Sequence, residues 1–158
     1  MNSPRHRVRI RRMSEADVDR VMEIGERLAE APNWLASAYA EAVDPKHIPR
    51  RIALVAEDPE SDALAGFLVA SLGEREAELE TIAVGAEAQR RGVGELLFRA
   101  LVEELRAEQV SELTLEVRAS NRAALGFYRA QGFEETGRRP RYYADPEEDA
   151  VLMGLNLA

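Results

Sequence analysis

The feature that most constrains the fold is an abrupt change in hydrophobic spacing near residue 92. The run "AELETIAV" (residues 77–84) has the length and composition of a buried strand, and "QRRGVG", Gln89 to Gly94, follows it. From Gly92 to Glu108 the apolar residues recur every three or four positions, which is the spacing of one helix face. The sequence therefore predicts a strand, a short loop rich in glycine and arginine, and an amphipathic helix.

The loop "QRRGVG" has two interpretations. It is either an ordinary strand-to-helix turn or a cradle for an anion, because the first N–H groups of a helix lack partners inside it and carry partial positive charge. Gly92 and Gly94 would let a ligand approach the backbone, and Arg90 and Arg91 would add charge-assisted bonds to phosphate. A dinucleotide-binding loop fits poorly, since Leu97 stands where the third glycine of that motif belongs.

The same spacing rules predict the other elements of the chain. Strands are expected over residues 7–13, 51–58, 63–72, 77–84, 111–118, 133–143 and 149–157, and helices after residue 14 and over 34–43, 92–108 and 120–132. Short turns between the second, third and fourth strands indicate an antiparallel meander. The chain is therefore predicted to form one α/β domain over residues 1–158 with a mixed sheet.

Composition narrows the classes of ligand. The net charge of −8 argues against nucleic acid or an anionic membrane as a partner, so an anionic ligand needs a local site. The chain has no cysteine, which removes disulfides and thiolate chemistry and is typical of a cytoplasmic protein. His6 and His47 lie far apart without carboxylate spacing for a metal, and no run of 18 apolar residues indicates a membrane span.

Two other features have more than one interpretation. The first strand places Arg7, Arg9 and Arg11 on one side, which is either a solvated face or an RNA-binding face. The lack of interleaved aromatic residues favours the solvated face. Trp34 either lines a substrate groove or simply packs in the core.

The loop and the sequence around it resemble a known family. "QRRGVG" after "LETIAV" looks like the acetyl-CoA signature of the GNAT acetyltransferase superfamily, and the element order matches that fold over nearly the whole chain. "LTLEVRASNRAALGFYRAQGF" and "RRPRYYADPEEDAVLMGL" resemble the RimI family, which acetylates the N-terminal alanine of a small-subunit ribosomal protein, and are similar to archaeal N-terminal acetyltransferases. The specific resemblance covers Leu79 to Leu155. It implies a GNAT fold with a mixed, mostly antiparallel sheet of about seven strands flanked by about four helices.

The resemblance implies acetyl-CoA as cosubstrate, without a metal. In this fold the fourth strand bulges and splays from the fifth, so that its backbone pairs with the pantetheine arm like a neighbouring strand. The strand residues concerned are Ile82, Ala83 and Val84. The residues implied around the pyrophosphate are Gln89, Arg90, Arg91, Gly92, Val93, Gly94 and Glu95, and Asn121 would bind near the pantetheine.

The resemblance also implies two catalytic residues. By themselves, Glu116 fits a solvated strand face and Tyr128 fits core packing. The glutamate that matches Glu116 is the general base of the family, and it would remove a proton directly or through water from an α-amine, whose pKa is roughly 7.7–8.0. The tyrosine that matches Tyr128 protonates the departing thiolate, which a phenol of pKa ~10 can do for a thiol of pKa ~8.5.

The implied acceptor is the N-terminus of a protein or peptide, with a ribosomal protein as one candidate. Tyr142 and Tyr143 would contact the peptide backbone, or they are ordinary strand aromatics. The acidic loop "DPEEDA" either attracts a basic peptide or is simply solvated. Two alternatives stay open: acetylation of a small-molecule amine, and a non-catalytic CoA-binding module. We expect a cytoplasmic protein that is a monomer or a weak homodimer.

Overall fold

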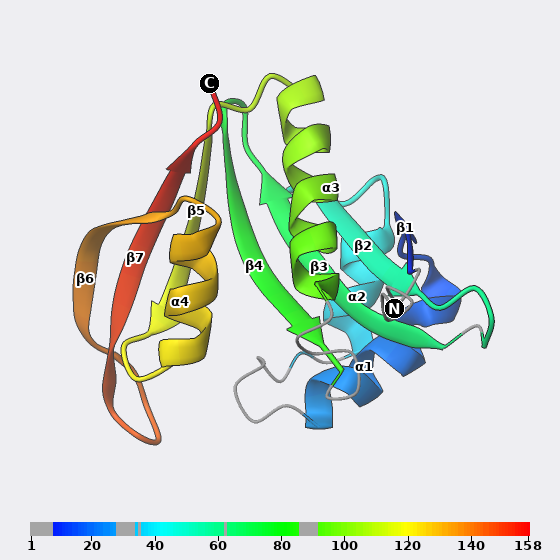
Figure 1. Ribbon diagram of the computed structural model, residues 1–158, viewed down its shortest axis with the longest axis horizontal. Coiled ribbons are helices and arrows are strands. Elements are labelled where there is room, and N and C mark those ends of the chain that lie inside the picture. The colour runs from blue at the N-terminus through cyan, green and yellow to red at the C-terminus, as the bar shows by residue number, and fades with distance from the viewer. Residues whose placement is uncertain (1–7, 28–33, 35, 62, 86–91) are drawn as a thin grey trace, which may run out of the picture.

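The structure, a computed structural model, describes residues 8–27, 34, 36–61, 63–85 and 92–158. Seven strands form one sheet in the order β1-β2-β3-β4-β5-β7-β6 (Figure 1). The strands are β1 (Arg9–Arg12), β2 (Arg51–Glu57), β3 (Leu64–Leu72), β4 (Glu76–Val84), β5 (Glu112–Arg118), β6 (Glu134–Tyr143) and β7 (Glu148–Asn156). The helices in these segments are the 3-10 turn η1 (Glu15–Asp17), α1 (Val18–Arg27), α2 (Ala36–Val43), α3 (Val93–Ala107) and α4 (Arg122–Ala130). The predicted order of elements and the mixed sheet are confirmed.

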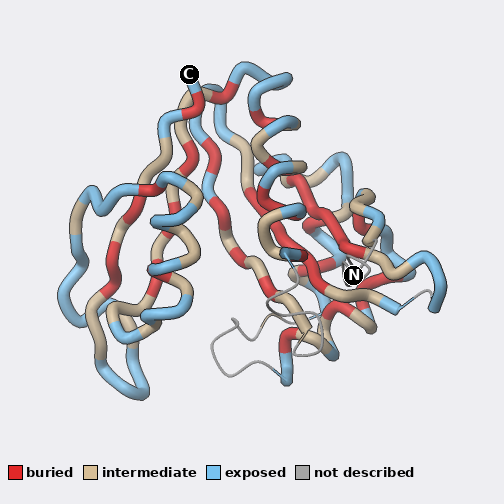
Figure 2. Tube along the Cα trace, viewed as in Figure 1, coloured by how far each residue is buried: buried red, intermediate tan, exposed pale blue. Residues whose placement is uncertain are grey.

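Helices cover both faces of the sheet, and each face has its own core. The larger core packs α3 and α4 against one face, with Leu97, Leu101 and Leu113 fully buried. The smaller core packs α1 and α2 against the other face of β2, β3 and β4, around Tyr39 and Phe67. Figure 2 shows the buried residues concentrated along these central strands. Within the described segments, no helix is long and apolar enough to cross a membrane.

One pair of strands interrupts the regular sheet. Every neighbouring pair is antiparallel except β4 with β5, which run parallel and pair only over Glu76–Glu78. In the pairing of β4 with β3, Val69 lies opposite Thr81 and Ala70 opposite Leu79, so Glu80 is the extra residue of a bulge. Beyond it β4 and β5 diverge toward the lower end of Figure 1, and we call the gap between these two strands the opening. The splay that the resemblance implied is confirmed.

A buried carboxylate fixes the first strand to the first helix. Asp17 is 1% exposed and accepts hydrogen bonds from the guanidinium of Arg11 at 2.7 and 2.8 Å and from the backbone N–H of Ser14 at 2.8 Å. The bond to Arg11, opposed by burial, lowers the pKa of Asp17. Arg11 also donates to Glu57 of β2 at 2.6 Å. The prediction of a solvated arginine face is therefore wrong for Arg11, because two carboxylates from neighbouring elements hold it.

Gly66 of β3 has no room for a side chain, and this generates a prediction about stability. A Cβ at Gly66 would lie 2.7 Å from the carbonyl oxygen of Ala83 and 3.3 Å from the Cα of Val84, so β4 would have to shift. We expect Gly66→Ala to lower the free energy of unfolding by about 2 kcal/mol, measured by urea denaturation.

Gly126 provides the matched control for the same chemical change. A Cβ there meets no atom within 4 Å, and the residue lies inside α4. Gly126→Ala should therefore stabilise the protein by about 0.5–1 kcal/mol. Equal effects of the two substitutions would contradict the steric argument.

The Asp17 network generates a second prediction. Asp17→Asn should cost about 3 kcal/mol at pH 7, because it removes the anion from a buried ion pair. The pKa of Asp17 is lower in the folded chain than in the unfolded one, so its stabilisation is present above the unfolded pKa and is lost as the pH falls below about 4. Denaturant titrations should show the gap between wild type and variant closing in acid. The exposed Asp19→Asn is the control, and a gap of constant size would refute the prediction.

Candidate active site

The start of α3 presents backbone donors that have no partner inside the helix. Its first hydrogen bond runs from the N–H of Leu96 to the carbonyl of Gly92 at 3.1 Å, so the N–H groups of residues 93–95 have no partner within the helix. Gly92 has a φ of +79°, a conformation that favours glycine. The side chain of Glu95 accepts a hydrogen bond from Arg99 at 2.7 Å and turns along the helix surface. Such a helix start suits an anion.

Part of the predicted phosphate loop lies outside the described residues, namely Gln89, Arg90 and Arg91. The structure describes how Gly94, just after this segment, packs against its neighbours. A Cβ at Gly94 would lie 3.5 Å from the ring of Phe127 and 3.6 Å from the side chain of Val84. The N-terminus of α3 therefore lies between the end of β4 and α4, at the opening between β4 and β5.

The opening exposes one edge of β4. Its residues Ile82 and Ala83 pair with β3 on the other side, and β5 pairs with β4 only as far as Glu78 in the described chain. An extended ligand can therefore take the place of a strand along this edge. Asn121 lies at the opposite side, where its side-chain oxygen caps α4 by accepting from the N–H of Ala124 at 3.0 Å. That bond leaves the amide nitrogen of Asn121 as a donor.

Glu116 lies on β5, on the sheet face opposite α3 and α4. Leu115 and Val117 belong to the core under those helices, and strand alternation turns Glu116 the other way. The side chain of Glu116 is 24% exposed and lies 3.7 Å from the Nε of Arg139 on β6. Tyr142 hydrogen-bonds to Glu116, and this bond raises the pKa of the phenol.

Tyr128 lies on α4, on the other face of the sheet. Its ring packs against Phe127 and Phe133, with centroids 5.6 and 5.7 Å away. Burial, and then the nearby Tyr143, raise the pKa of Tyr128 to about 12, so the phenol stays protonated. Burial and then Glu116 raise the pKa of Tyr143. Tyr143 thus lies within electrostatic reach of both Glu116 and Tyr128.

The hairpin of β6 and β7 holds the tyrosine pair. The rings of Tyr142 and Tyr143 meet edge to face at 5.1 Å, and the guanidinium of Arg118 stacks over Tyr143 at 4.4 Å. Tyr142 is about half exposed, which suits contact with an acceptor. Arg118 also pairs with Glu148 at 3.4 Å.

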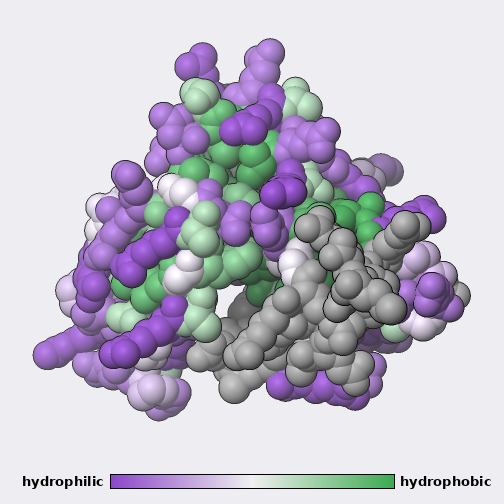
Figure 3. Space-filling model, in the orientation of Figure 1, coloured by the Kyte–Doolittle hydropathy of each residue, from purple (hydrophilic) through white to green (hydrophobic). Residues whose placement is uncertain are grey.

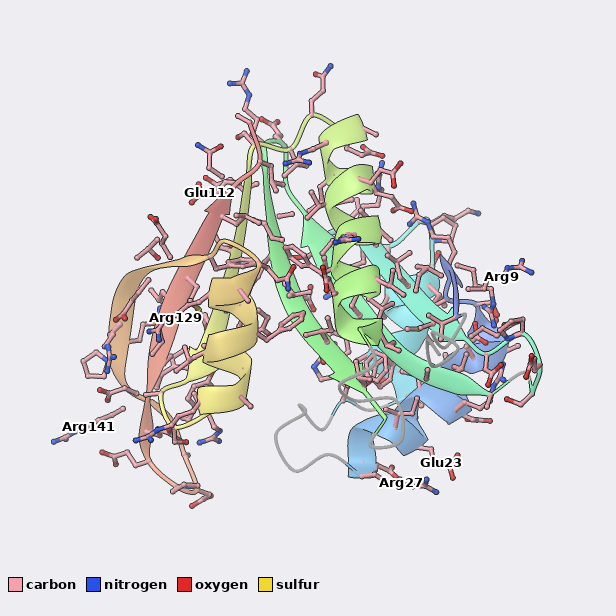
Figure 4. The ribbon with its side chains drawn as sticks, viewed as in Figure 1. Arg9, Glu23, Arg27, Glu112, Arg129 and Arg141 are labelled. Atoms are coloured by element: carbon pink, nitrogen blue, oxygen red, sulfur yellow. The ribbon has the colours of Figure 1, made fainter. Side chains whose placement is uncertain are left out.

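Arginine side chains of the hairpin and of β5 pair with part of the acidic loop. Glu147 pairs with Arg141 at 3.2 Å, and the carboxylate of Asp149 accepts from the backbone N–H of Arg141 at 3.0 Å. Glu148 accepts from the N–H of Ser120 as well as from Arg118. Figure 4 shows Arg141 directed away from the opening. Two of the four carboxylates of this loop, those of Glu147 and Glu148, are therefore paired with arginine side chains.

Trp34 packs beside the smaller core. Its ring lies 5.2 Å from that of Tyr39, between centroids, and is half-buried. This contact favours the packing interpretation, and a role in substrate binding stays a prediction. Among the described residues, no group of three or more histidine and carboxylate side chains is placed to hold a metal.

Two residues at this site were missed by the sequence interpretation. Arg139 pairs with Glu116, and Glu78 of β4 lies close enough to Glu116 to feel its charge. The available signal for Glu78 was the same as for Glu116, a carboxylate within a strand beside apolar neighbours. No spacing within the sequence predicts that β6 brings Arg139 to β5, because this contact depends on the order of strands in the sheet.

The elements that carry these residues border one hollow. Figure 3 shows the surface hollowed between α4 and the lower end of β4, at the place where the strands diverge. A proton acceptor, Glu116, lies on one face of the sheet and a proton donor, Tyr128, on the other. The unpaired N–H groups of α3 lie at the same opening. The arrangement can bind an extended anionic ligand and move protons at both ends of a reacting group.

Comparison with known proteins identifies relatives of this chain. The model of the acetyltransferase (GNAT) family matches residues 19–133. The ribosomal protein bS18-alanine N-acetyltransferase of Salmonella typhimurium is 42% identical over 99 residues, which are 61% of this chain and 67% of that protein. The match thus spans about two thirds of that relative's length. The protein of the same name from Haemophilus ducreyi is 32% identical over 146 residues, covering 90% of this chain and 96% of its own.

Solved structures agree with these sequence matches. The crystal structure of the ribosomal-protein-S18-alanine N-acetyltransferase from Escherichia coli superposes with a TM-score of 0.84 at 31% identity, covering 96% of this chain and 95% of that one. Ard1 from Thermoplasma volcanium superposes with a TM-score of 0.83 at 27% identity, covering 96% and 98%. The fold expected from the sequence is confirmed.

Proposed function

Because the chain belongs to the acetyltransferase (GNAT) family, we propose that it transfers an acetyl group from acetyl-CoA to the N-terminal α-amine of a protein. The observation that carries the proposal is the opening between β4 and β5, with Glu116 on one face and Tyr128 on the other. The two substrates would approach from opposite faces and meet in this opening.

The cosubstrate would bind along β4 and α3. Its pantetheine arm would pair with the backbone of residues 82–84 in place of a strand, and Asn121 would donate to it from the start of α4. The pyrophosphate would bind to the N–H groups of residues 92–95. The side chains of residues 89–91 would complete this site.

Glu116 would act as the general base on the attacking nitrogen. Direct attack of a neutral amine on the thioester carbonyl forms the amide without a covalent enzyme intermediate. The ion pair with Arg139 and the hydrogen bond with Tyr142 would hold the Glu116 carboxylate in place. Tyr128 would donate its proton to the sulfur as the carbon–sulfur bond breaks. Its raised pKa keeps that proton available at neutral pH.

The identity of the acceptor is the most specific part of the proposal. The relatives from Salmonella and Haemophilus are named for the N-terminal alanine of ribosomal protein bS18, and the exposed Tyr142 beside Tyr143 offers aromatic surface for a peptide. We therefore propose a peptide N-terminus of this alanine type over a small-molecule amine. A ribosomal protein substrate also implies action in the cytoplasm.

An assay of acceptors tests this proposal. The protein is incubated with acetyl-CoA and a panel of Ala-, Ser- and Met-starting peptides together with small amines such as polyamines, and released CoA thiol is measured. We expect turnover with the Ala-starting peptide. Turnover with small amines alone would sink the peptide proposal, and binding of CoA without any turnover would favour a non-catalytic module.

Replacing Tyr128 with Phe tests the proton donor. The loss of general acid catalysis should lower kcat by about 100-fold. The affinity for acetyl-CoA, measured by calorimetry, should stay nearly unchanged because the ring and its packing remain. Tyr39→Phe is the control, since it makes the same change in the smaller core and should leave kcat intact. An unchanged kcat in Tyr128→Phe would remove this residue from the mechanism.

A further inference from the structure

At the end of the hairpin, β6 leaves its regular pairing with β7. The register shifts between Arg139 and Tyr143, where three residues of β6 lie against one residue of β7. Arg141 and Asp145 in this end have φ values of +54° and +51°, a region that residues other than glycine rarely adopt. A regular strand ladder therefore does not fix the segment that carries Tyr142 and Tyr143, and its placement depends on side-chain contacts.

One guanidinium, that of Arg118, contacts four residues of this end of the hairpin. It stacks over the ring of Tyr143 at 4.4 Å and pairs with the carboxylate of Glu148 at 3.4 Å. Its N–H groups donate to the carbonyl oxygen of Ala144 at 3.4 Å and to that of Pro146 at 3.2 Å. A planar fork with five donors can make these contacts together, whereas a compact ammonium group cannot.

Arg118 comes from the strand that carries the proposed base. It lies two residues after Glu116 on β5, and side chains two residues apart on a strand share one face of the sheet. The pairing of β5 with β7 is regular from Glu112 to Arg118, so the backbone that carries both side chains is fixed. Arg118 therefore ties the tyrosine pair to the strand of Glu116.

The contribution of Arg118 lies in ordering this segment more than in the energy of its ion pair. Its side chain is 33% exposed, and a partly exposed ion pair such as that with Glu148 adds little to stability. Several contacts from one rigid group restrict the turn and the ring of Tyr143 before a ligand arrives. A peptide that binds to an ordered surface does not have to supply the free energy for ordering it.

We propose that Arg118 is a positioning residue for the acceptor, which acts through Tyr143 to hold the aromatic surface of the hairpin in place. This inference rests on the proposed function. Arg118 lies on the sheet face opposite α3 and α4, because its neighbour Val117 belongs to the core under those helices. It is therefore expected to affect binding of the peptide and not binding of acetyl-CoA. The guanidinium stays protonated, so it takes no part in the proton transfers.

Steady-state kinetics of Arg118→Met test this role. With saturating acetyl-CoA and the Ala-starting peptide, we expect the KM for the peptide to rise about 10-fold, because the hairpin must then be ordered on binding. The kcat should stay within twofold of wild type, since the chemical groups are unchanged. The Kd of acetyl-CoA, measured by calorimetry, should not change. An unchanged KM for the peptide, or a loss confined to kcat, would overturn the proposal.

Arg118→Lys separates the planar fork from its charge. Lysine keeps the positive charge beside Glu148 but cannot also stack and donate to both carbonyl groups. The KM for the peptide should therefore stay several-fold above that of wild type. Full recovery of the wild-type KM would overturn the role of the fork.

A double-mutant cycle tests whether Arg118 acts through Tyr143. Tyr143→Ala removes the ring on which the guanidinium stacks. In that background, Arg118→Met should raise the KM for the peptide by less than a further twofold, because the two substitutions interrupt one chain of contacts. Effects that simply multiply would contradict an action through this ring.

Arg141→Met is the matched control. Arg141 belongs to the same end of the hairpin and pairs with Glu147 at 3.2 Å, but its side chain is 82% exposed. The variant loses an ion pair of the hairpin and should keep the wild-type KM for the peptide. An equal rise of KM in Arg141→Met and Arg118→Met would show a general loosening of the hairpin and overturn the specific role of Arg118.

Failure of the proposed function gives a different result. Wild type that turns over only a small amine would refute the peptide acceptor, and the KM for that amine in the same variants would then decide the role of Arg118. Wild type that turns over no amine would overturn both the function and the inference.

Discussion

The parallel pairing of β4 with β5 stops after three residues, and the site is built around that interruption. A continuous ladder would bury both strand edges and close the sheet. Here the bulge at Glu80 turns β4 away while the antiparallel partners of each strand hold the two halves in place. Backbone groups that normally bind a neighbouring strand are left for a ligand, and the two faces of the sheet communicate through the opening.

This arrangement separates the chemistry by sheet face. Tyr128 packs among the aromatic rings of the larger core, and burial keeps its phenol protonated. Glu116 and Glu78 lie on the other face, where Arg139 and Tyr142 surround them. All of these groups lie on strands or on α4. Gly66 supports the pairing of β3 with β4, because a Cβ there would lie 2.7 Å from the carbonyl oxygen of Ala83.

Most of the fold follows from hydrophobic spacing. The order of elements, the meander of β2 to β4 and the helix after Gly92 are local features, and each carries its own signal in the sequence. Contacts between strands that are distant in sequence have no such local signal. Arg139 of β6 reaches Glu116 of β5 across β7, and Arg11 is partly buried because η1 presents Asp17 to it. The roles of Glu116 and Tyr128 came from resemblance to a family, since spacing alone also fits a solvated glutamate and a packed tyrosine.

The outer strand β6 has a consequence for the behaviour of the protein at high concentration. It ends the sheet, so one of its edges has no strand beside it within the described chain. Long unpaired edges promote aggregation by adding strands from other molecules. This edge carries Arg138, Arg139 and Arg141 around Pro140, and proline lacks the N–H that such pairing needs. The stretch of β6 that places Arg139 beside Glu116 therefore also disfavours edge-to-edge pairing between copies of the chain.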